Sequence, residues 1–268
     1  MKINKEVNDV SSFCIIALQI SYFLSIYRHI PNLFTLSNLA FGLLSISLAF
    51  SDHLVLASYS IVLAIVLDFC DGLLARLLNA SSEVGKQLDS LADLVSFGVA
   101  PSFITLQLFV SFYDDILISD YISSLIKGEH RYIIPFIVFI IPLFSALRLA
   151  RFNNQQTIGS FAGLPTPANA LFYGSLPLIT NYQSDSFITQ FLLREEVLTT
   201  AVVLFSWMMV SNIEFLAFKF STFNWDSNKS KYLFLIASFV LLLIFHFVAV
   251  PIILLLYFIF SLVNTIKR

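Results

Sequence analysis

The apolar residues of this chain gather in runs of about twenty, and the polar stretches between the runs are short. Segment 231–264 is the extreme case, because it offers almost no polar face in any direction. A helix needs about 20 mainly apolar residues to cross a bilayer, whereas a surface helix of a soluble bundle keeps one polar side. Only 12% of the residues are charged, about half the share in soluble domains. The sequence therefore predicts an all-α protein that crosses a membrane several times.

Eight runs have the length and composition of membrane spans. We expect them near residues 33–51, 54–76, 88–112, 134–151, 166–182, 195–213, 231–248 and 249–265. Two prolines and a glycine interrupt the fifth, and the last two meet near Pro251, so one long kinked element is the alternative there. Residues 13–27 are apolar but short, which predicts a helix lying in the membrane interface before the first span.

Lysine and arginine are distributed unequally between the two ends of these spans. If the end of the second span, with Arg76 and Lys86, faces the cytoplasm, twelve cationic residues fall on that side and three on the other. The other ten on the cytoplasmic side are Lys2, Lys5, Arg28, Arg148, Arg151, Lys219, Lys229, Lys231, Lys267 and Arg268. Cytoplasmic loops carry the excess of positive charge, so both termini are expected there. The net charge of −2 gives no reason to expect a nucleic-acid partner.

Four aspartates lie next to the second and third spans: Asp68, Asp71, Asp89 and Asp93. The members of each pair are three or four residues apart, so each pair shares one helix face. The turn at 79–85 is short enough to fold one helix back along the other. Carboxylates beside a span are costly and normally functional. We therefore expect all four to converge near the cytoplasmic ends of two neighbouring helices.

Carboxylates at such close quarters repel one another, and a hard divalent cation such as Mg²⁺ or Mn²⁺ relieves that repulsion. Two such ions bridged by carboxylates stabilise displacement at phosphorus. Gly72 and Gly85 fit this interpretation, because a missing side chain lets a nucleotide or a helix approach the backbone. Arg76 can pair with a carboxylate or a phosphate. The alternative, that the aspartates cap helices or form interfacial ion pairs, explains one or two acids but not four at helical spacing.

The run D-x2-D-G-x2-A-R-x8-G-x3-D-x3-D, from Asp68 to Asp93, resembles the signature of the CDP-alcohol phosphotransferases. Every fixed position is present. The resemblance implies a membrane-embedded core of six helices, a CDP-linked donor and a two-metal site for Mg²⁺ or Mn²⁺. A single domain over 1–268 is then expected, with a cytoplasmic start and interfacial helix (1–30), a catalytic six-helix core (31–213) and about two further helices (214–268).

The same resemblance implies roles for individual residues. Asp93 resembles the family's general base and lies near the metals. The implied metal ligands are Asp68, Asp71 and Asp89, together with Asp93. The implied wall of the CDP site is Asp68, Gly72, Ala75 and Arg76.

Further stretches of the chain resemble this family. Residues 31–38 open the first span, as similar segments do beside the family's cytidine pocket, which makes Thr35 and Asn38 candidates for nucleotide binding. The alternative is that they are ordinary residues of a helix start. Residues 90–101, 148–153 and 161–167 resemble the membrane-embedded phosphatidylserine synthases, a branch of the family. That likeness covers roughly 30–180 and implies CDP-diacylglycerol and L-serine as substrates.

Arg148 and Arg151 are three residues apart at the end of the fourth span, so both can face one cavity. A guanidinium binds phosphate or carboxylate through two parallel hydrogen bonds, which suits the donor phosphate or the carboxylate of serine. Asn153 is a third candidate for the same site. The alternative is that the two arginines anchor the helix at the lipid headgroups.

Two other interpretations stay open from the sequence. A transferase of the same family with glycerol 3-phosphate or inositol phosphate as acceptor would share the acidic motif. A divalent-cation transporter would use the four aspartates as an ion site, although such proteins often carry internal repeats and none is visible here. We expect the cell (inner) membrane as the location, with the active site on the cytoplasmic side, and the chain is compatible with a homodimer.

Overall fold

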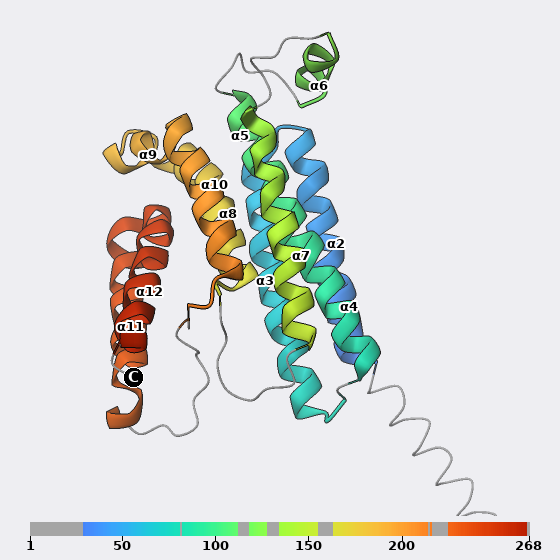
Figure 1. Cartoon of the computed structure of the whole chain (residues 1–268), viewed down its shortest axis with the longest axis vertical. Coiled ribbons are helices and arrows are strands. Elements are labelled where there is room, and N and C mark those ends of the chain that lie inside the picture. The colour runs from blue at the N-terminus through green and yellow to red at the C-terminus, as the bar shows by residue number, and fades with distance from the viewer. Residues whose placement is uncertain are drawn as a thin grey trace, which may run out of the picture.

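A computed structural model of the chain describes residues 29–80, 82–111, 118–127, 134–154, 163–213, 215 and 225–266. Every element within these residues is a helix, and the long helices stand side by side in an elongated bundle (Figure 1). The interfacial helix expected at 13–27 lies outside the described residues. The all-α prediction is confirmed.

Six helical rods form the core of the bundle. One of them, over residues 83–111, is a composite rod in which a π-helix joins two α-helices. The rods are α2 (Ile30–Phe50), α3 (Leu54–Leu77), α4–η1–α5 (Glu83–Asp93, Leu94–Val99 and Ala100–Ser111), α7 (Ile140–Asn154), α8 (Thr166–Tyr182) and α10 (Glu195–Val210). Helix α2 packs along α3 and against the composite rod, α8 packs on α3 and α5, and α10 packs on α7.

Five of the described helical stretches are long and apolar enough to cross a membrane, so the chain is a multi-pass membrane protein. They are Ile30–Phe50, Leu54–Leu77, Glu83–Ser111, Pro135–Asn153 and Lys231–Leu262. Helices α8 and α10 have 17 and 16 residues, which at 1.5 Å per residue gives each roughly 25 Å. Both lie between the group of α2, α3, α5 and α7 and the C-terminal hairpin (Figure 1). The predicted polytopic helical bundle is confirmed.

Short elements close the end of the bundle opposite the α3–α4 turn. They are α6 (Ile118–Ile126), the 3-10 helix η3 (Ile134–Phe139) at the start of α7, and α9 (Phe187–Leu192). The main apolar core lies between α2, α3, η1, α5, α8 and α10, with Ile61, Phe97, Ile104 and Tyr173 fully buried. The opposite end, where α3 meets α4, carries the acidic residues.

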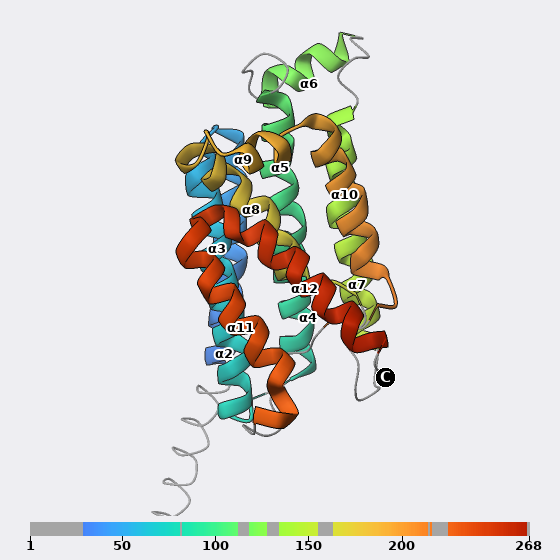
Figure 2. The same ribbon diagram turned by 90° about the vertical axis from the view of Figure 1, so that its left-hand side faces the viewer.

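The C-terminal part is a helical hairpin of α11 (Trp225–Phe245) and α12 (Ala249–Ile266), joined by the 3-10 turn η4 (His246–Val248) (Figure 2). The chain reverses at His246, whose φ is 48°, and not at Pro251. Pro251 lies in the first turn of α12, where its missing N–H leaves no helical bond unmade. Two helices are therefore present, as expected, rather than one kinked element.

Residues at the end of α8 hold the tip of this hairpin on the core. The Nε2 of Gln183, directly after α8, donates to the Phe245 carbonyl at 3.0 Å, and its Oε1 accepts from the Val248 N–H at 3.1 Å. Beside it, the rings of Tyr182 and Phe247 stack with centroids 5.4 Å apart. The two hydrogen bonds pair backbone groups at the break between α11 and α12. Left unpaired in an apolar surrounding, these groups would destabilise the structure.

Candidate active site

The turn between α3 and α4 folds the two helices back along each other. Asn79 adopts a φ of 49°, a left-handed conformation that asparagine tolerates better than most residues. Ser82 caps α4, because its Oγ accepts from the Gly85 N–H at 3.0 Å. A Cβ at Gly85 would lie 3.3 Å from Asn32 Oδ1, so the glycine lets α4 lie close to the start of α2.

This arrangement brings the aspartates of the two helices together. Asp68, Asp71 and Asp89 each offer one carboxylate oxygen, and these oxygens all lie within 4.8 Å of one another. The carboxyl of Asp93 lies within hydrogen-bonding reach of that of Asp68. Asp71 and Asp93 are buried, with 5% and 9% of their surfaces exposed. The convergence that the spacing predicts is therefore present, while the separate roles of the four stay predictions.

The donor set fits a divalent metal ion. Three carboxylate oxygens at this separation repel one another strongly in a partly buried site. Within the described part of the chain, Oδ1 of Asp89 is buried and accepts no hydrogen bond. A hard cation prefers oxygen ligands of this kind and would satisfy both conditions. Asp68, Asp71 and Asp89 are the residues placed to hold it.

Helix α2 supplies polar side chains that fix two of the acids. Thr35 Oγ1 donates to Asp71 Oδ2 at 2.6 Å, and Asn38 Nδ2 donates to Asp93 Oδ1 at 3.3 Å. Both α2 residues are almost fully buried. Ser96 Oγ in turn donates to the Asn38 carbonyl at 3.0 Å. The nucleotide role considered for Thr35 and Asn38 stays a prediction, and the contact seen here is with the acids.

A π-helix begins directly after Asp93. Over Leu94–Val99 the backbone takes the wider π turn before it returns to an α-helix at Ala100. There η1 packs closely on α2, because a Cβ at Gly42 would collide with Ser96. π-bulges are rare and concentrate at functional sites. Nothing in the sequence pattern predicts it, since residues 94–99 read as an ordinary continuation of the third span.

The residues implied for the CDP wall lie on the end of α3. Gly72 borders open space, because a Cβ built there would have no heavy atom of another residue within 4 Å. Ala75 is half-buried and Arg76 is exposed. A nucleotide can therefore approach the backbone at Gly72 beside the acids, although its contact with these residues stays a prediction.

The three residues proposed to hold phosphate or serine separate in the structure. Arg148 is close enough to Asp93 for a favourable electrostatic interaction, and its Nη1 donates to Thr166 Oγ1 at 3.5 Å. Arg151 is exposed, and its Nη1 donates to the Val210 carbonyl at 3.0 Å. Asn153 Nδ2 donates to Ser90 Oγ at 3.0 Å. Of the three, Arg148 interacts with Asp93, Asn153 contacts α4 next to Asp89, and Arg151 contacts the end of α10.

The buried Nε of Arg148 has no hydrogen-bond partner in the described structure. A guanidinium nitrogen left unpaired in a buried place is costly unless a ligand completes its bonds. The cationic group is also close enough to Asp93, the acid expected to act as base, for a favourable electrostatic interaction. Arg148 is thus placed to bind an anionic group of a substrate beside Asp93.

A glycine turn holds Thr166 beside Arg148. Gly163 has a φ of 86°, and a Cβ there would collide with the Met209 carbonyl. The N–H groups of Gly163 and Leu164 donate to the carbonyls of Ile213 and Met208 at 2.9 and 3.0 Å. This pairing with the end of α10 fixes the start of α8. The glycine and prolines in the sequence predict the turn, but nothing in the sequence predicts the contact between Thr166 and Arg148.

Comparison with known proteins gives a consistent answer. The sequence profile of the CDP-alcohol phosphatidyltransferases matches residues 28–207. The CDP-diacylglycerol–serine O-phosphatidyltransferase of Helicobacter pylori (strain J99) is 39% identical over 193 residues, which cover 70% of this chain and 72% of that protein. The enzyme of the same name from Bacillus subtilis (strain 168) is 32% identical over 197 residues, covering 72% and 92%. The one from Methanocaldococcus jannaschii is 36% identical over 161 residues, covering 59% and 66%. The chain belongs to the CDP-alcohol phosphatidyltransferase family.

Proposed function

We propose that this protein transfers the phosphatidyl group of CDP-diacylglycerol to the hydroxyl of L-serine, which yields phosphatidylserine and CMP. The observation that carries the proposal is the convergence of Asp68, Asp71 and Asp89 within 4.8 Å, with Asp93 and Arg148 beside them. The serine acceptor is favoured by the names of the relatives, which are similar over more than two thirds of this chain.

The reaction needs a base, because the hydroxyl of serine is a poor nucleophile at neutral pH. Asp93 accepts the hydroxyl proton as the serine oxygen forms its bond to the lipid-linked phosphorus. The bond from that phosphorus to the oxygen of CMP then breaks. The Asn38 amide, which donates to Asp93 Oδ1, fixes the orientation of this carboxyl group beside the other acids.

The other three acids act by position rather than by proton transfer. Asp68, Asp71 and Asp89 would hold Mg²⁺ or Mn²⁺, and the bound cations would neutralise charge on the pyrophosphate and on the departing CMP. Thr35 holds Asp71 by a 2.6 Å hydrogen bond, which keeps this carboxylate aimed at the shared centre. Gly72 leaves room for the nucleotide beside it.

Arg148 binds the carboxylate of serine in this mechanism. Its unpaired Nε and its place beside Asp93 put an anion-binding group next to the base. A carboxylate held there brings the hydroxyl of the same serine toward Asp93. Arg151 and Asn153 are engaged elsewhere, so they are better suited to shaping the cytoplasmic rim of the site.

Changing Arg148 to lysine is expected to raise the KM for serine roughly tenfold, because an ammonium cannot form the two parallel bonds of a guanidinium. The KM for CDP-diacylglycerol should change little. Steady-state kinetics with each substrate varied in turn measures both values. Arg194→Lys, at the exposed start of α10, is the matched control and should match the parent protein. An unchanged KM for serine in Arg148→Lys would show that the carboxylate binds elsewhere.

An acceptor screen tests the proposed function directly. Purified protein in mixed micelles receives CDP-diacylglycerol, Mn²⁺ and one acceptor: L-serine, glycerol 3-phosphate or inositol phosphate. Of the three acceptors, only L-serine is expected to give CMP release and a lipid product. A product from glycerol 3-phosphate or inositol phosphate and none from serine would overturn the serine assignment and keep the reaction type.

The sidedness of the site follows from the same proposal. Arg76 and Lys86 are exposed at the acidic end of the bundle, and cationic residues favour the cytoplasmic face. Serine and CMP are soluble, whereas the acyl chains of the donor stay in lipid. We therefore place the acidic end at the cytoplasmic face of the cell (inner) membrane. The single domain over 1–268 and a homodimer stay predictions.

A further inference from the structure

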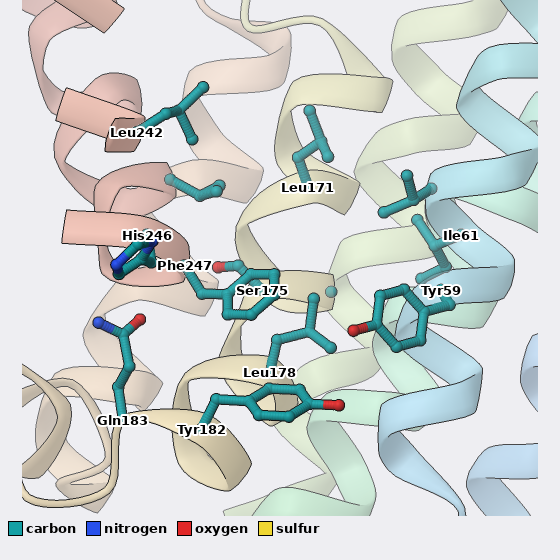
Figure 3. Close-up of a pocket in the computed structure, with 13 residues that line it drawn as sticks. Tyr59, Ile61, Leu171, Ser175, Leu178, Tyr182, Gln183, Leu242, His246 and Phe247 are labelled. Atoms are coloured by element: carbon teal, nitrogen blue, oxygen red, sulfur yellow. The ribbon is translucent and has the colours of Figure 1, made fainter. Parts of the chain in front are cut away.

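A cavity of about 570 Å³ lies between the six-helix core and the C-terminal hairpin (Figure 3). Helices α3 and α8 form one side, and α11, η4 and α12 form the other. The size is within the range of small-molecule binding sites. The residues that define its two sides are Tyr59, Val62, Gly174 and Leu178 from the core and Leu242 and Phe247 from the hairpin.

The lining of this cavity suits an apolar ligand. None of the described residues that line it is an aspartate, glutamate, lysine or arginine. The Ser175 hydroxyl donates to the Phe172 carbonyl of its own helix at 2.7 Å, and the amide of Gln183 is occupied by the hairpin turn. The other polar groups of the lining are the imidazole of His246 and the hydroxyls of Tyr59 and Tyr182, and the remaining lining side chains are apolar. A charged or strongly polar molecule would lose its hydration here without compensation.

The depth of the cavity relates it to the acidic site. Tyr59 precedes Asp68 by nine residues on the same helix, which corresponds to about 13.5 Å along the axis. One leaflet contributes half of the roughly 30 Å hydrocarbon layer, about 15 Å. A lipid whose phosphate lies at the aspartates therefore has chain ends that reach the level of Tyr59.

An apolar face of α3 connects the two places. Tyr59, Val62, Val66, Phe69 and Leu73 follow one another at intervals of three and four residues and are all exposed, so they form one stripe along the helix. Phe69, which is 70% exposed, lies between Asp68 and Asp71 in the chain. The stripe thus runs from the level of the acids to the mouth of the cavity.

We propose that the cavity binds the distal part of one acyl chain of the donor lipid, whose phosphate lies at the acidic site. This inference rests on the proposed function for the identity of the donor. The hairpin supplies one wall, and it lies beyond residues 28–207, the part that the family profile covers. The C-terminal hairpin therefore has a role in substrate binding, because it holds the end of the acyl chain against the core. Gln183 and the Tyr182–Phe247 stack fix the tip of the hairpin.

Photo-crosslinking of the full-length protein tests this placement. The probe is CDP-diacylglycerol with a diazirine at the terminal end of one acyl chain, and a second probe carries the diazirine near the glycerol. After irradiation, mass spectrometry of peptides locates the adducts. The terminal probe should mark the peptides of Leu178, Leu242 and Phe247, and the glycerol-proximal probe should mark α3 near Phe69. Unlabelled CDP-diacylglycerol should suppress both.

A substitution that fills the cavity provides the second measurement. A Cβ at Gly174 would be in ordinary contact with Ile61, at 3.7 Å, so the rest of a leucine side chain would extend into the cavity. Gly174→Leu should lower the adduct yield from the terminal probe by on the order of tenfold, because the added side chain occupies the space of the acyl chain and weakens its binding. Ser47→Leu, exposed on α2 and not part of the cavity lining, is the control. Leu242→Trp fills the cavity from the hairpin if Gly174→Leu fails to fold.

Three results would overturn the inference. In the first, the terminal probe marks the outer faces of α2 or α7 instead of the cavity. In the second, the glycerol-proximal probe marks the cavity, which would indicate a lipid of the opposite leaflet. In the third, folded Gly174→Leu and Leu242→Trp both keep full adduct yield. If the proposed function is wrong, a different result is expected: the cavity would still be labelled, but the acceptor screen would give no phosphatidylserine.

Discussion

Replacing Asp93 by asparagine is expected to reduce phosphatidyl transfer to serine by on the order of 10²–10⁴-fold, the usual contribution of a general base. Asparagine has the same shape but cannot accept the proton of the serine hydroxyl. The three other acids keep their places, because Thr35 holds Asp71 and the α3–α4 turn does not involve Asp93. Mn²⁺ binding and donor binding should therefore stay close to those of the parent protein.

Two measurements separate this base role from a loss of structure. CMP release with and without serine gives the rate, and electron paramagnetic resonance of free Mn²⁺ gives the bound metal. Asp120→Asn, an exposed acid on α6 far from the site, is the control and should behave as the parent protein does. Near-normal turnover by Asp93→Asn would assign the base elsewhere. Loss of both turnover and Mn²⁺ binding would make Asp93 a metal ligand first.

The acidic end of the bundle could be predicted because helix periodicity fixes it. Asp68 and Asp71, like Asp89 and Asp93, share a face at spacings of three and four, and the seven residues 79–85 leave room only for a tight return. Each of these facts is local, so the chain alone places the carboxylates together. The structure adds their partners on α2, Thr35 and Asn38. Their spacing of three residues is visible in the sequence, but which acid each one meets depends on packing.

Other features depend on contacts between distant segments and carry no local signal. The π-helix after Asp93 arises where η1 meets α2 at Gly42 and Ser96. Arg148 and Arg151 have the same spacing as Asp68 and Asp71, yet only Arg148 lies at the acids. The end of α10 offers the Val210 carbonyl to Arg151 instead, and spacing along one helix cannot reveal that neighbour.

The C-terminal hairpin shows the same limit. Its hydrophobicity predicts two spans, and proline is the usual sign of a break. The reversal instead occurs at His246, because Gln183 of the preceding core satisfies the carbonyl of Phe245 and the N–H of Val248. A break that a distant side chain stabilises has no marker within the hairpin itself. The cavity between the hairpin and the core could not be predicted either, because its lining comes from helices that are far apart in the sequence.

Replacing Asp68 by asparagine is expected to weaken Mn²⁺ binding by on the order of 100-fold or more, since even outer-shell changes cost 10–100-fold. Asp68 is central to the cluster: its carboxyl interacts with those of both Asp89 and Asp93. A neutral amide removes one anionic ligand and eases the repulsion among the remaining acids. Folding should therefore survive, and the thermal stability of the metal-free protein should be equal to or above that of the parent.

The two aspartate variants then give opposite patterns, which is the sharpest test of the assigned roles. Asp68→Asn should lose Mn²⁺ binding and regain some turnover at high Mn²⁺, whereas Asp93→Asn should bind Mn²⁺ and show no recovery. Glu83→Gln, an exposed acid in the first turn of α4, controls for loss of nearby negative charge and should keep both properties. Chelation of the parent protein should abolish CMP release, and added Mn²⁺ should restore it. If Asp68→Asn binds Mn²⁺ as tightly as Glu83→Gln does, the metal is held by other groups and the mechanism proposed for Asp68, Asp71 and Asp89 fails.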